Sequence, residues 1–378
     1  MWKAYVTVFL VASLCVICEA SGVAPDPSDG IVSMPVKGGF VTVNLDGQRV
    51  NLLLDSNFFE ISVVDGDWYE RAYGEGACRK RENSGCYFCP EDAPCDFDND
   101  SSSSTTRFDG GLVIRTISRS GSLELDGQNV DLIFKVSRPV GSNRDAGLKA
   151  FFGISLLPKG PDQIEGRESV LDSLVRGGVI GRLSFSLQTN ISQVSDFASG
   201  QLTLGGKADD NYTFLKLVED QRYHRAFPAV WVSSINLADT GTKPRSAREH
   251  AARTPFVAFM DTGANGIYVP RPDLLNGMKQ RLLLRWQGNG VWKRDAKGFL
   301  HVKGQSCLDL PQLNLRLSDG IDAVPIRIRP KHYCVTQRIG EDVVLVQENS
   351  IKILGAPFFK AYSVYVDYVD KKIGLLEN

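Results

Sequence analysis

The sequence carries no excess of charge of either sign. Its 43 lysines and arginines nearly balance 44 aspartates and glutamates, so the formal net charge is -1 and the pI is near 6.5. A balanced chain produces no basic field that would hold nucleic acid or an anionic lipid surface, and we expect neither partner. Hydrophobic residues make up 43% and charged residues 23% of the chain, which is typical of a globular protein rather than a disordered or fibrous one.

Histidine is scarce and scattered. The four histidines have no spacing typical of a metal site: His224, His250, His301 and His332. The Gly-x-Ser-x-Gly motif of serine hydrolases and the glycine-rich phosphate loop are both absent. These absences argue against metal, serine-nucleophile and nucleotide chemistry, so we expect no metal and no cofactor.

Long apolar runs are absent beyond the first twenty residues. Lys3 precedes an apolar run from about Ala4 to Cys18, and Cys18-Glu19-Ala20 places small residues where signal peptidase cuts. Residues 1–20 are therefore predicted to be a signal peptide, with the mature chain beginning near Ser21 and little room for a propeptide. A membrane anchor is the alternative, but the run is shorter than the roughly 20 residues that a spanning helix needs.

Six of the eight cysteines remain after removal of the signal peptide. Four crowd into one loop and two stand alone downstream: Cys78, Cys86, Cys89, Cys95, Cys307 and Cys334. The Cys86-Tyr87-Phe88-Cys89 spacing also fits zinc or redox chemistry, but the export signal and the lack of a nearby histidine favour two local disulfides, whose pairing stays open. Three sequons fit a secreted glycoprotein, at Asn99, Asn190 and Asn211.

Short apolar or alternating runs between turn residues predict a mostly β protein. The expected strands are Gly39 to Leu45, Val50 to Leu54, Gly121 to Leu125, Val130 to Val136, Leu183 to Leu187, Gln201 to Leu204, Val230 to Leu237 and Tyr362 to Asp367. Asp46-Gly47 is expected to join the first two of them. Helical spacing occurs only briefly, from Glu168 to Val175 and from Pro270 to Trp286.

An internal repeat divides the chain into two similar halves. An apolar strand leads into Asp55-Ser56-Asn57, and Phe151-Phe152-Gly153 follows much later. In the second half an apolar strand leads into Asp261-Thr262-Gly263, and Ile353-Leu354-Gly355 follows at a similar distance. Two halves with the same pacing indicate duplicated lobes.

These motifs resemble the pepsin-like aspartic peptidases from Gly39 to Leu375. Asp261-Thr262-Gly263 between apolar strands is similar to the second catalytic triplet of that family, and Ile353 to Asp367 is similar to its closing segment. Ser184 to Leu187 and Gly200 to Gly206 look like its paired strands near the end of the first lobe. A lone Asp-Thr-Gly is common by chance, whereas this ordered set is specific.

The resemblance implies a mostly β, two-lobed pepsin-like fold with a cleft between duplicated lobes. It implies catalytic roles for Asp55 and Asp261, which would share a proton and activate a water. Ser56 and Thr262 would link the lobes, and Gly263 would let a backbone N–H approach a carboxylate. The resemblance further implies a structural disulfide between Cys307 and Cys334.

The first motif departs from the family pattern. Asn57 stands where the family has glycine, and Phe58 stands where it has a small hydroxyl residue. Ser62 occupies the usual tryptophan position. Placing the flap turn at Gly121-Ser122, within a flap from Thr116 to Leu123, puts Ser118 at the usual tyrosine position. The candidate site is therefore atypical on one side.

We expect a secreted aspartic endopeptidase that binds an extended peptide or protein, with an N-terminal lobe at 21–218 and a C-terminal lobe at 219–378. We expect a monomer in the secretory pathway, either secreted or in an acidic endolysosomal compartment. Two alternatives remain open. One is a catalytically impaired homologue that acts as a protein-binding or inhibitor module, and the other is an interaction protein whose loop from Cys78 to Cys95 is the working surface.

Overall fold

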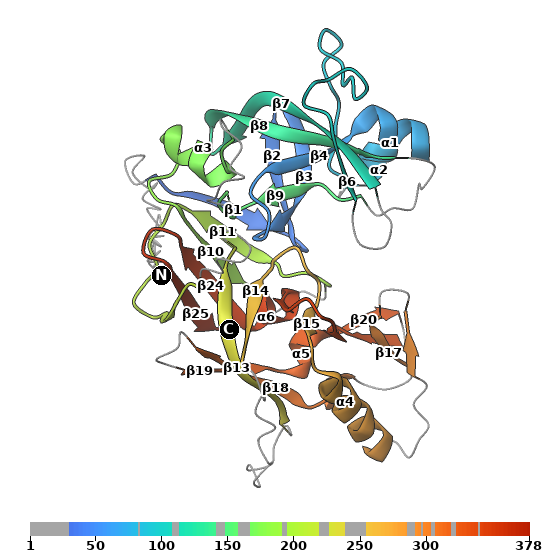
Figure 1. Cartoon of the computed structure of the whole chain (residues 1–378), viewed down its shortest axis with the longest axis vertical. Coiled ribbons are helices and arrows are strands. Elements are labelled where there is room, and N and C mark those ends of the chain that lie inside the picture. Colours follow the sequence, from blue (N-terminus) through green and yellow to red (C-terminus); the bar gives the residue numbers. More distant parts are fainter. Residues whose placement is uncertain are drawn as a thin grey trace, which may run out of the picture.

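The computed structural model describes residues 30–81, 84–107, 113–140, 148–157, 167–190, 195–218, 227–238, 255–285, 292–295, 298–303, 307–318, 323–338 and 341–378. The predicted signal peptide lies outside these residues, as do His224 and His250. The fold is mostly β with few helices, as predicted, and Figure 1 shows two lobes stacked along the long axis.

The N-terminal lobe is built on one large sheet. Its strands run in the order β2 (Phe40–Leu45), β3 (Gln48–Asp55), β9 (Phe151–Gly153), β4 (Ile61–Asp65), β8 (Gln128–Pro139), β7 (Val113–Leu125) and β6 (Ser104–Arg107), with β5 (Cys86–Tyr87) beside β4. Asp46 and Gly47 join β2 to β3 with φ angles of 50° and 74°, which confirms the predicted turn. In β8 every second residue from Val130 to Val136 is buried, so one face of the hairpin packs into the core.

The predicted flap turn at Gly121-Ser122 is wrong. Both residues lie inside β7, where Gly121 pairs with Leu132, and Ser118 pairs with Lys135 in the same ladder. The β7–β8 hairpin itself turns at Asp126-Gly127, with φ angles of 50° and 72°. Gly121 is explained by crowding, because a Cβ there would lie 2.5 Å from Asp46 Oδ2. The hairpin that precedes this one is β6–β7, and its connection at 108–112 lies outside the described residues.

The C-terminal lobe contains two sheets. The larger runs in the order β19 (Ala323–Ile328), β18 (Gln312–Ser318), β13 (Ala229–Ala238), β14 (Phe256–Met260), β23 (Ile353–Leu354), β15 (Ile267–Val269) and β22 (Val346–Glu348). The smaller runs β16 (Trp292–Arg294), β17 (Leu300–Lys303), β21 (Glu341–Val344) and β20 (Cys334–Arg338). The short helices η2 (Cys307–Asp309), α5 (Pro330–Tyr333) and α6 (Ala356–Ala361) pack beside them.

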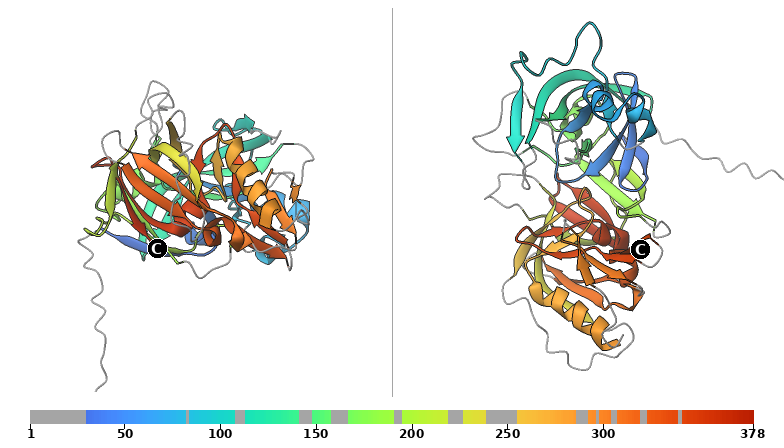
Figure 2. Two further views of the ribbon diagram at one scale, coloured as in Figure 1. Left: turned by 90° about the horizontal axis from the view of Figure 1, so that it is seen from below. Right: turned by 90° about the vertical axis from the view of Figure 1, so that its right-hand side faces the viewer.

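A third sheet contains strands from both halves of the chain. Its order is β1 (Val32–Val36), β11 (Gly200–Leu204), β10 (Ser184–Thr189), β24 (Tyr362–Asp367), β25 (Lys372–Glu377) and β12 (Thr213–Lys216). β24, from the closing segment, pairs with β10 of the first half, and β25 pairs with β12. This sheet lies between the two lobes in Figure 1 and in the right-hand view of Figure 2. The lobe boundary at 218 and 219 stays a prediction, because residues 219–226 lie outside the described ones.

Both predicted helices are confirmed with adjusted bounds. The first is α3 (Val170–Arg176), which begins with a reciprocal capping box between Ser169 and Asp172. The second is α4 (Pro272–Arg285) at the far end of the C-terminal lobe. Two further helices, α1 (Gly66–Tyr73) and α2 (Ala77–Lys80), carry the cysteine-rich loop.

Three disulfides account for all six cysteines among the described residues. They join Cys78 to Cys86, Cys89 to Cys95 and Cys307 to Cys334. The two cysteines of the C-x-x-C segment thus bond to different partners, which settles the pairing that the sequence left open. Structural disulfides fit the oxidising compartment expected for a secreted chain. Among the described residues no helix combines the length and the apolar character needed to cross a membrane.

Candidate active site

Asp55 and Asp261 occupy equivalent places in the two lobes. Asp55 is the last residue of β3, and Asp261 directly follows β14. Each strand is paired in parallel with the apolar segment that the repeat places after it: β3 with β9, and β14 with β23. The repeat seen in the sequence is therefore a repeat in three dimensions.

The glycine that ends each apolar segment packs against an aspartate loop. A Cβ at Gly153 would lie 2.5 Å from the backbone oxygen of Phe58, and one at Gly355 would lie 2.5 Å from that of Ala264. Neither position has room for a side chain. This close approach explains why both segments of the repeat end in glycine.

Reciprocal hydrogen bonds join the two aspartate loops. Ser56 N–H donates to Thr262 Oγ1 at 3.0 Å, and Thr262 N–H donates to Ser56 Oγ at 3.1 Å. The hydroxyls in turn donate across the interface, from Ser56 to Met260 O at 2.7 Å and from Thr262 to Leu54 O at 2.9 Å. Both side chains are buried, so these four bonds hold the loops together in a site shielded from water.

The two carboxyls meet beside Gly263. A Cβ built at this glycine would lie 2.8 Å from Asp55 Oδ2 and 3.3 Å from Asp261 Oδ1. The missing side chain thus leaves room for both groups. Backbone donors support each of them: Asn57 N–H bonds Asp55 Oδ1 at 2.8 Å, and Gly263 N–H bonds Asp261 Oδ1 at 2.8 Å. Ala264 N–H adds a second backbone donor to Asp261 at 3.1 Å.

Burial raises the pKa of both carboxyls. The pKa of Asp55 is held well above its usual range by burial first and then by the negative charge of Asp261. The pKa of Asp261 is also raised by burial, while hydrogen bonds from Gly263 N–H, the Asn57 side chain and Ala264 N–H act in the opposite direction. Simultaneous ionisation of two buried carboxyls is unfavourable when they lie this close together.

Phe58, three residues after Asp55, belongs to an aromatic cluster. The Phe58 ring lies 5.6 Å from Phe151 and 5.9 Å from Phe59, measured between centroids. Phe58 therefore packs along the edge of β9 instead of offering a hydroxyl to Asp55. A small hydroxyl residue at this position would leave the flank of Asp55 more polar.

Polar side chains continue from this aromatic cluster across the same face of the sheet. Ser62 pairs with Phe151 on one side and with Lys135 on the other, and Lys135 pairs with Ser118. Directly paired residues point to the same face, so the four side chains form one row. Lys135 Nζ donates to Ser118 Oγ at 2.5 Å, and Ser118 N–H donates to Ser102 Oγ at 2.8 Å. Ser118 is thus tied into strand contacts rather than placed at a hairpin tip.

A buried acid beside this row had no signal in the sequence. Glu60 is only 7% exposed and accepts a hydrogen bond from Arg167 at 2.8 Å. Burial raises the pKa of Glu60, partly offset by the charges of Arg167 and Lys135, while burial lowers the pKa of Lys135. These three residues come from distant segments, and only the fold reveals their cluster.

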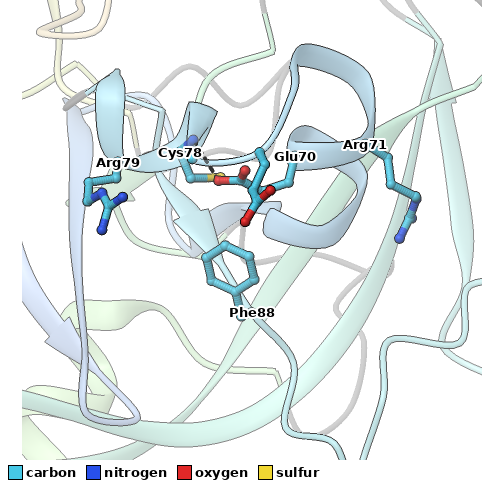
Figure 3. Close-up of a pocket in the computed structure, with 7 residues that line it drawn as sticks. Glu70, Arg71, Cys78, Arg79 and Phe88 are labelled. Atoms are coloured by element: carbon cyan, nitrogen blue, oxygen red, sulfur yellow. Dashed lines mark hydrogen bonds between the residues drawn. The ribbon is translucent and has the colours of Figure 1, made fainter.

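A hollow of about 580 Å³ lies away from the two aspartates, on the helices that carry the cysteine-rich loop (Figure 3). Its lining includes Glu70, Phe88, Arg71 and Arg79. The Glu70 carboxylate is already bonded to the backbone N–H groups of Ala77 and Cys78, at 3.1 and 2.9 Å. Glu70 therefore has a structural role, because these two bonds hold the start of α2 in place. Among the described residues no group of three or more His, Cys, Asp or Glu side chains is placed to hold a metal ion.

A family model for eukaryotic aspartyl proteases matches residues 105–377, well over half of the chain. The chain therefore belongs to the eukaryotic aspartyl protease family, and its two β lobes are those of the pepsin-like fold. The match includes Asp261 and Ile353-Leu354-Gly355 but begins after Asp55, in line with the altered first motif. No curated protein matches the chain in a direct sequence search.

Proposed function

We propose that this protein is an acid-active aspartic endopeptidase in which Asp55 and Asp261 form the catalytic dyad. The observation that carries the proposal is the reciprocal bonding of Ser56 and Thr262, which brings the two carboxyls together from opposite lobes. Burial and mutual repulsion keep a proton on the pair, which is the state required for acid and base to act together.

Catalysis by the dyad is hydrolysis by an activated water. The ionised carboxyl takes a proton from water as the oxygen attacks the peptide carbonyl carbon, and the protonated carboxyl donates to the carbonyl oxygen. The dyad needs no covalent intermediate and no bound metal. Sharing a buried proton also favours activity at acidic pH, where one carboxyl stays protonated.

The substrate is an extended peptide or a protein segment that lies between the lobes. The Phe58 and Phe151 rings offer an apolar wall beside Asp55, and Lys135 gives the same face a positive group further from it. The chain acts as a monomer in the secretory pathway, secreted or in an acidic endolysosomal compartment. The predicted signal peptide at 1–20 and the three disulfides support this location. Exposed Asn99 and Asn211 support glycosylation there.

One observation favours the alternative of a catalytically impaired binding module. The Asn57 side chain hydrogen-bonds the Asp261 carboxyl, in the space that glycine leaves open in the family pattern. An amide in that space competes with water for the dyad. A module of this kind would keep the fold and bind proteins without cutting them.

The test is peptide cleavage by residues 21–378, assayed from pH 3 to pH 7 against a mixed peptide library. Asp261→Asn removes one member of the dyad, and Asp92→Asn is the matched control because Asp92 is exposed and outside the site. Cleavage that persists in Asp92→Asn and disappears in Asp261→Asn establishes the peptidase. Absence of cleavage together with absence of binding to a statine-type inhibitor overturns it.

A further inference from the structure

Asn57 contacts both carboxyls of the dyad. Its backbone N–H donates to Asp55 Oδ1 at 2.8 Å, and its side chain hydrogen-bonds the carboxyl of Asp261. The φ angle of Asn57 is not positive, so the loop does not require the tolerance of asparagine for the left-handed region. The side chain is therefore explained by what it contacts rather than by the shape of the turn.

In the second lobe the position equivalent to Asn57 carries no side chain. Gly263 lies two residues after Asp261, just as Asn57 lies two residues after Asp55, so the two positions are equivalent. A Cβ at Gly263 would lie 2.8 Å from Asp55 Oδ2, the carboxyl of the opposite lobe. Because the lobes are related by the repeat, a side chain at position 57 is directed at the carboxyl of the opposite lobe. The hydrogen bond from Asn57 to Asp261 follows this geometry.

The two carboxyls consequently have unequal sets of donors. Asp261 accepts from Gly263 N–H, Ala264 N–H and the Asn57 side chain, whereas Asn57 N–H is the donor recorded for Asp55 among the described residues. Each hydrogen bond to a carboxylate favours its ionised form. The negative charge therefore has more support on Asp261 than on Asp55.

We propose that Asn57 is a positioning residue that holds the negative charge of the dyad on Asp261 and leaves the shared proton on Asp55. This assignment deepens the proposed peptidase function and rests on it. Asp261 is the general base, and Asp55 is the general acid.

The proton transfers balance over one cycle. Water loses a proton to Asp261 as its oxygen bonds the carbonyl carbon, and Asp55 gives its proton to the carbonyl oxygen to form a gem-diol. When the carbon–nitrogen bond breaks, Asp261 protonates the leaving amine and Asp55 takes a proton from a gem-diol hydroxyl. The dyad returns to its starting state with one water consumed.

The other end of the Asn57 amide is available for a ligand. Its Oδ1 is buried and has no hydrogen-bond partner among the described residues. Most buried polar atoms in folded proteins have a hydrogen-bond partner. With Nδ2 donating to Asp261, Oδ1 is left to accept from the catalytic water or from a peptide N–H of the substrate.

The test follows the ionisation of each aspartate by ¹³C NMR of the Cγ carboxyl carbons in residues 21–378. Asp55→Asn and Asp261→Asn assign the two resonances. In the wild-type protein Asp261 is expected to ionise at the lower pH. In Asn57→Gly and Asn57→Ala the midpoint of Asp261 ionisation should rise by about one pH unit, as expected for the loss of a hydrogen bond to a charged group. Two variants are used because alanine avoids the added backbone freedom of glycine.

Asn129→Gly is the matched control, since Asn129 is exposed at the start of β8 and outside the site. Its titration curves should coincide with those of the wild-type protein. Ionisation of Asp55 before Asp261, or unchanged titration in both Asn57 variants, would overturn the assignment. An Asn57→Gly protein that cleaves peptides faster with unchanged titration would also overturn it, because the amide would then only obstruct the water. The NMR measurement needs no turnover, so failure of this assignment and failure of the peptidase proposal are separate results.

Discussion

Ser56 and Thr262 are 206 residues apart in the sequence, yet each accepts the backbone N–H of the other, at 3.1 and 3.0 Å. Each hydroxyl then donates to a backbone oxygen of the opposite loop. The contact is reciprocal, buried and built from two motifs of the same repeat. The contact also fixes the position of the two aspartates relative to each other, because each aspartate directly precedes one of these residues.

Thr262→Val tests the energy of this contact. Valine keeps the shape of threonine but leaves Ser56 N–H and Leu54 O buried without their partner, so we expect a loss of about 2–4 kcal/mol in the free energy of unfolding. Urea denaturation measures it. Thr105→Val, at an exposed position of β6, is the control and should change stability by less than about 0.5 kcal/mol. Equal effects of the two substitutions would show that the contact adds no stability.

Asp55→Asn tests the raised pKa of the dyad through stability. A carboxyl whose folded pKa is raised stabilises the fold below its usual pKa of 3.8, and this contribution is lost as pH rises through the folded value. Asp55→Asn should therefore be more stable than the wild-type protein at pH 7 and no more stable at pH 3. Thermal unfolding at both values measures this, since 1 kcal/mol corresponds to about 2–4 °C in domains of 150–250 residues. A gain of equal size at both pH values contradicts the account.

The contribution of His332 to stability should have the opposite pH dependence to that of Asp55. The side chain is buried in α5, and burial first, then the nearby charges of Lys331, Arg329 and Lys360, lower its pKa from 6.5 to about 4. A lowered pKa gives stability that is present above pH 6.5 and is lost as pH falls through about 4. His332→Gln should reduce the loss of stability between pH 7 and pH 4. A wild-type slope of stability against pH that the substitution leaves unchanged would rule out this role.

Arg182→Ala tests the sheet shared by the two halves. Arg182 Nε and Nη2 donate to the two carboxylate oxygens of Asp367 at 2.9 and 3.0 Å, and Asp367 is 1% exposed. The acid would keep its bonds from Tyr365 Oη and two backbone N–H groups but lose its cationic partner, which should cost about 3–5 kcal/mol at neutral pH. Arg176→Ala is the matched control, because its ion pair with Glu168 is exposed and should contribute no more than about 1 kcal/mol. Similar losses in both variants would contradict the role assigned to the shared sheet.

The sequence predicted the features that depend on local pattern or on the repeat. Asp46-Gly47 forms a turn because both residues adopt positive φ readily, and the apolar runs before Asp55 and Asp261 are strands because they are buried on both faces. The turn predicted at Gly121-Ser122 was wrong, because both residues lie inside a long strand. Gly121 is there because the side chain of Asp46 lies too close for a Cβ.

Features that depend on contacts between distant segments were not predicted. The pairing within the four-cysteine loop needed the fold, since spacing alone permits several arrangements. The cluster of Glu60, Lys135 and Arg167 arises where three separate segments meet. Asn57 was recognised as a departure, but its bond to Asp261 in the other lobe requires the two loops to be in place.

The central claim is that Asp55, despite its altered motif, acts as one unit with Asp261. The most direct measurement is kcat/KM at acidic pH for Asp55→Asn, Asp261→Asn and the double variant. Groups that act as a unit are not additive, so each single variant should lose as much activity as the double variant, within about a factor of ten. If Asp55→Asn retains activity, or if the losses of the single variants multiply in the double variant, Asp55 is not a member of the dyad.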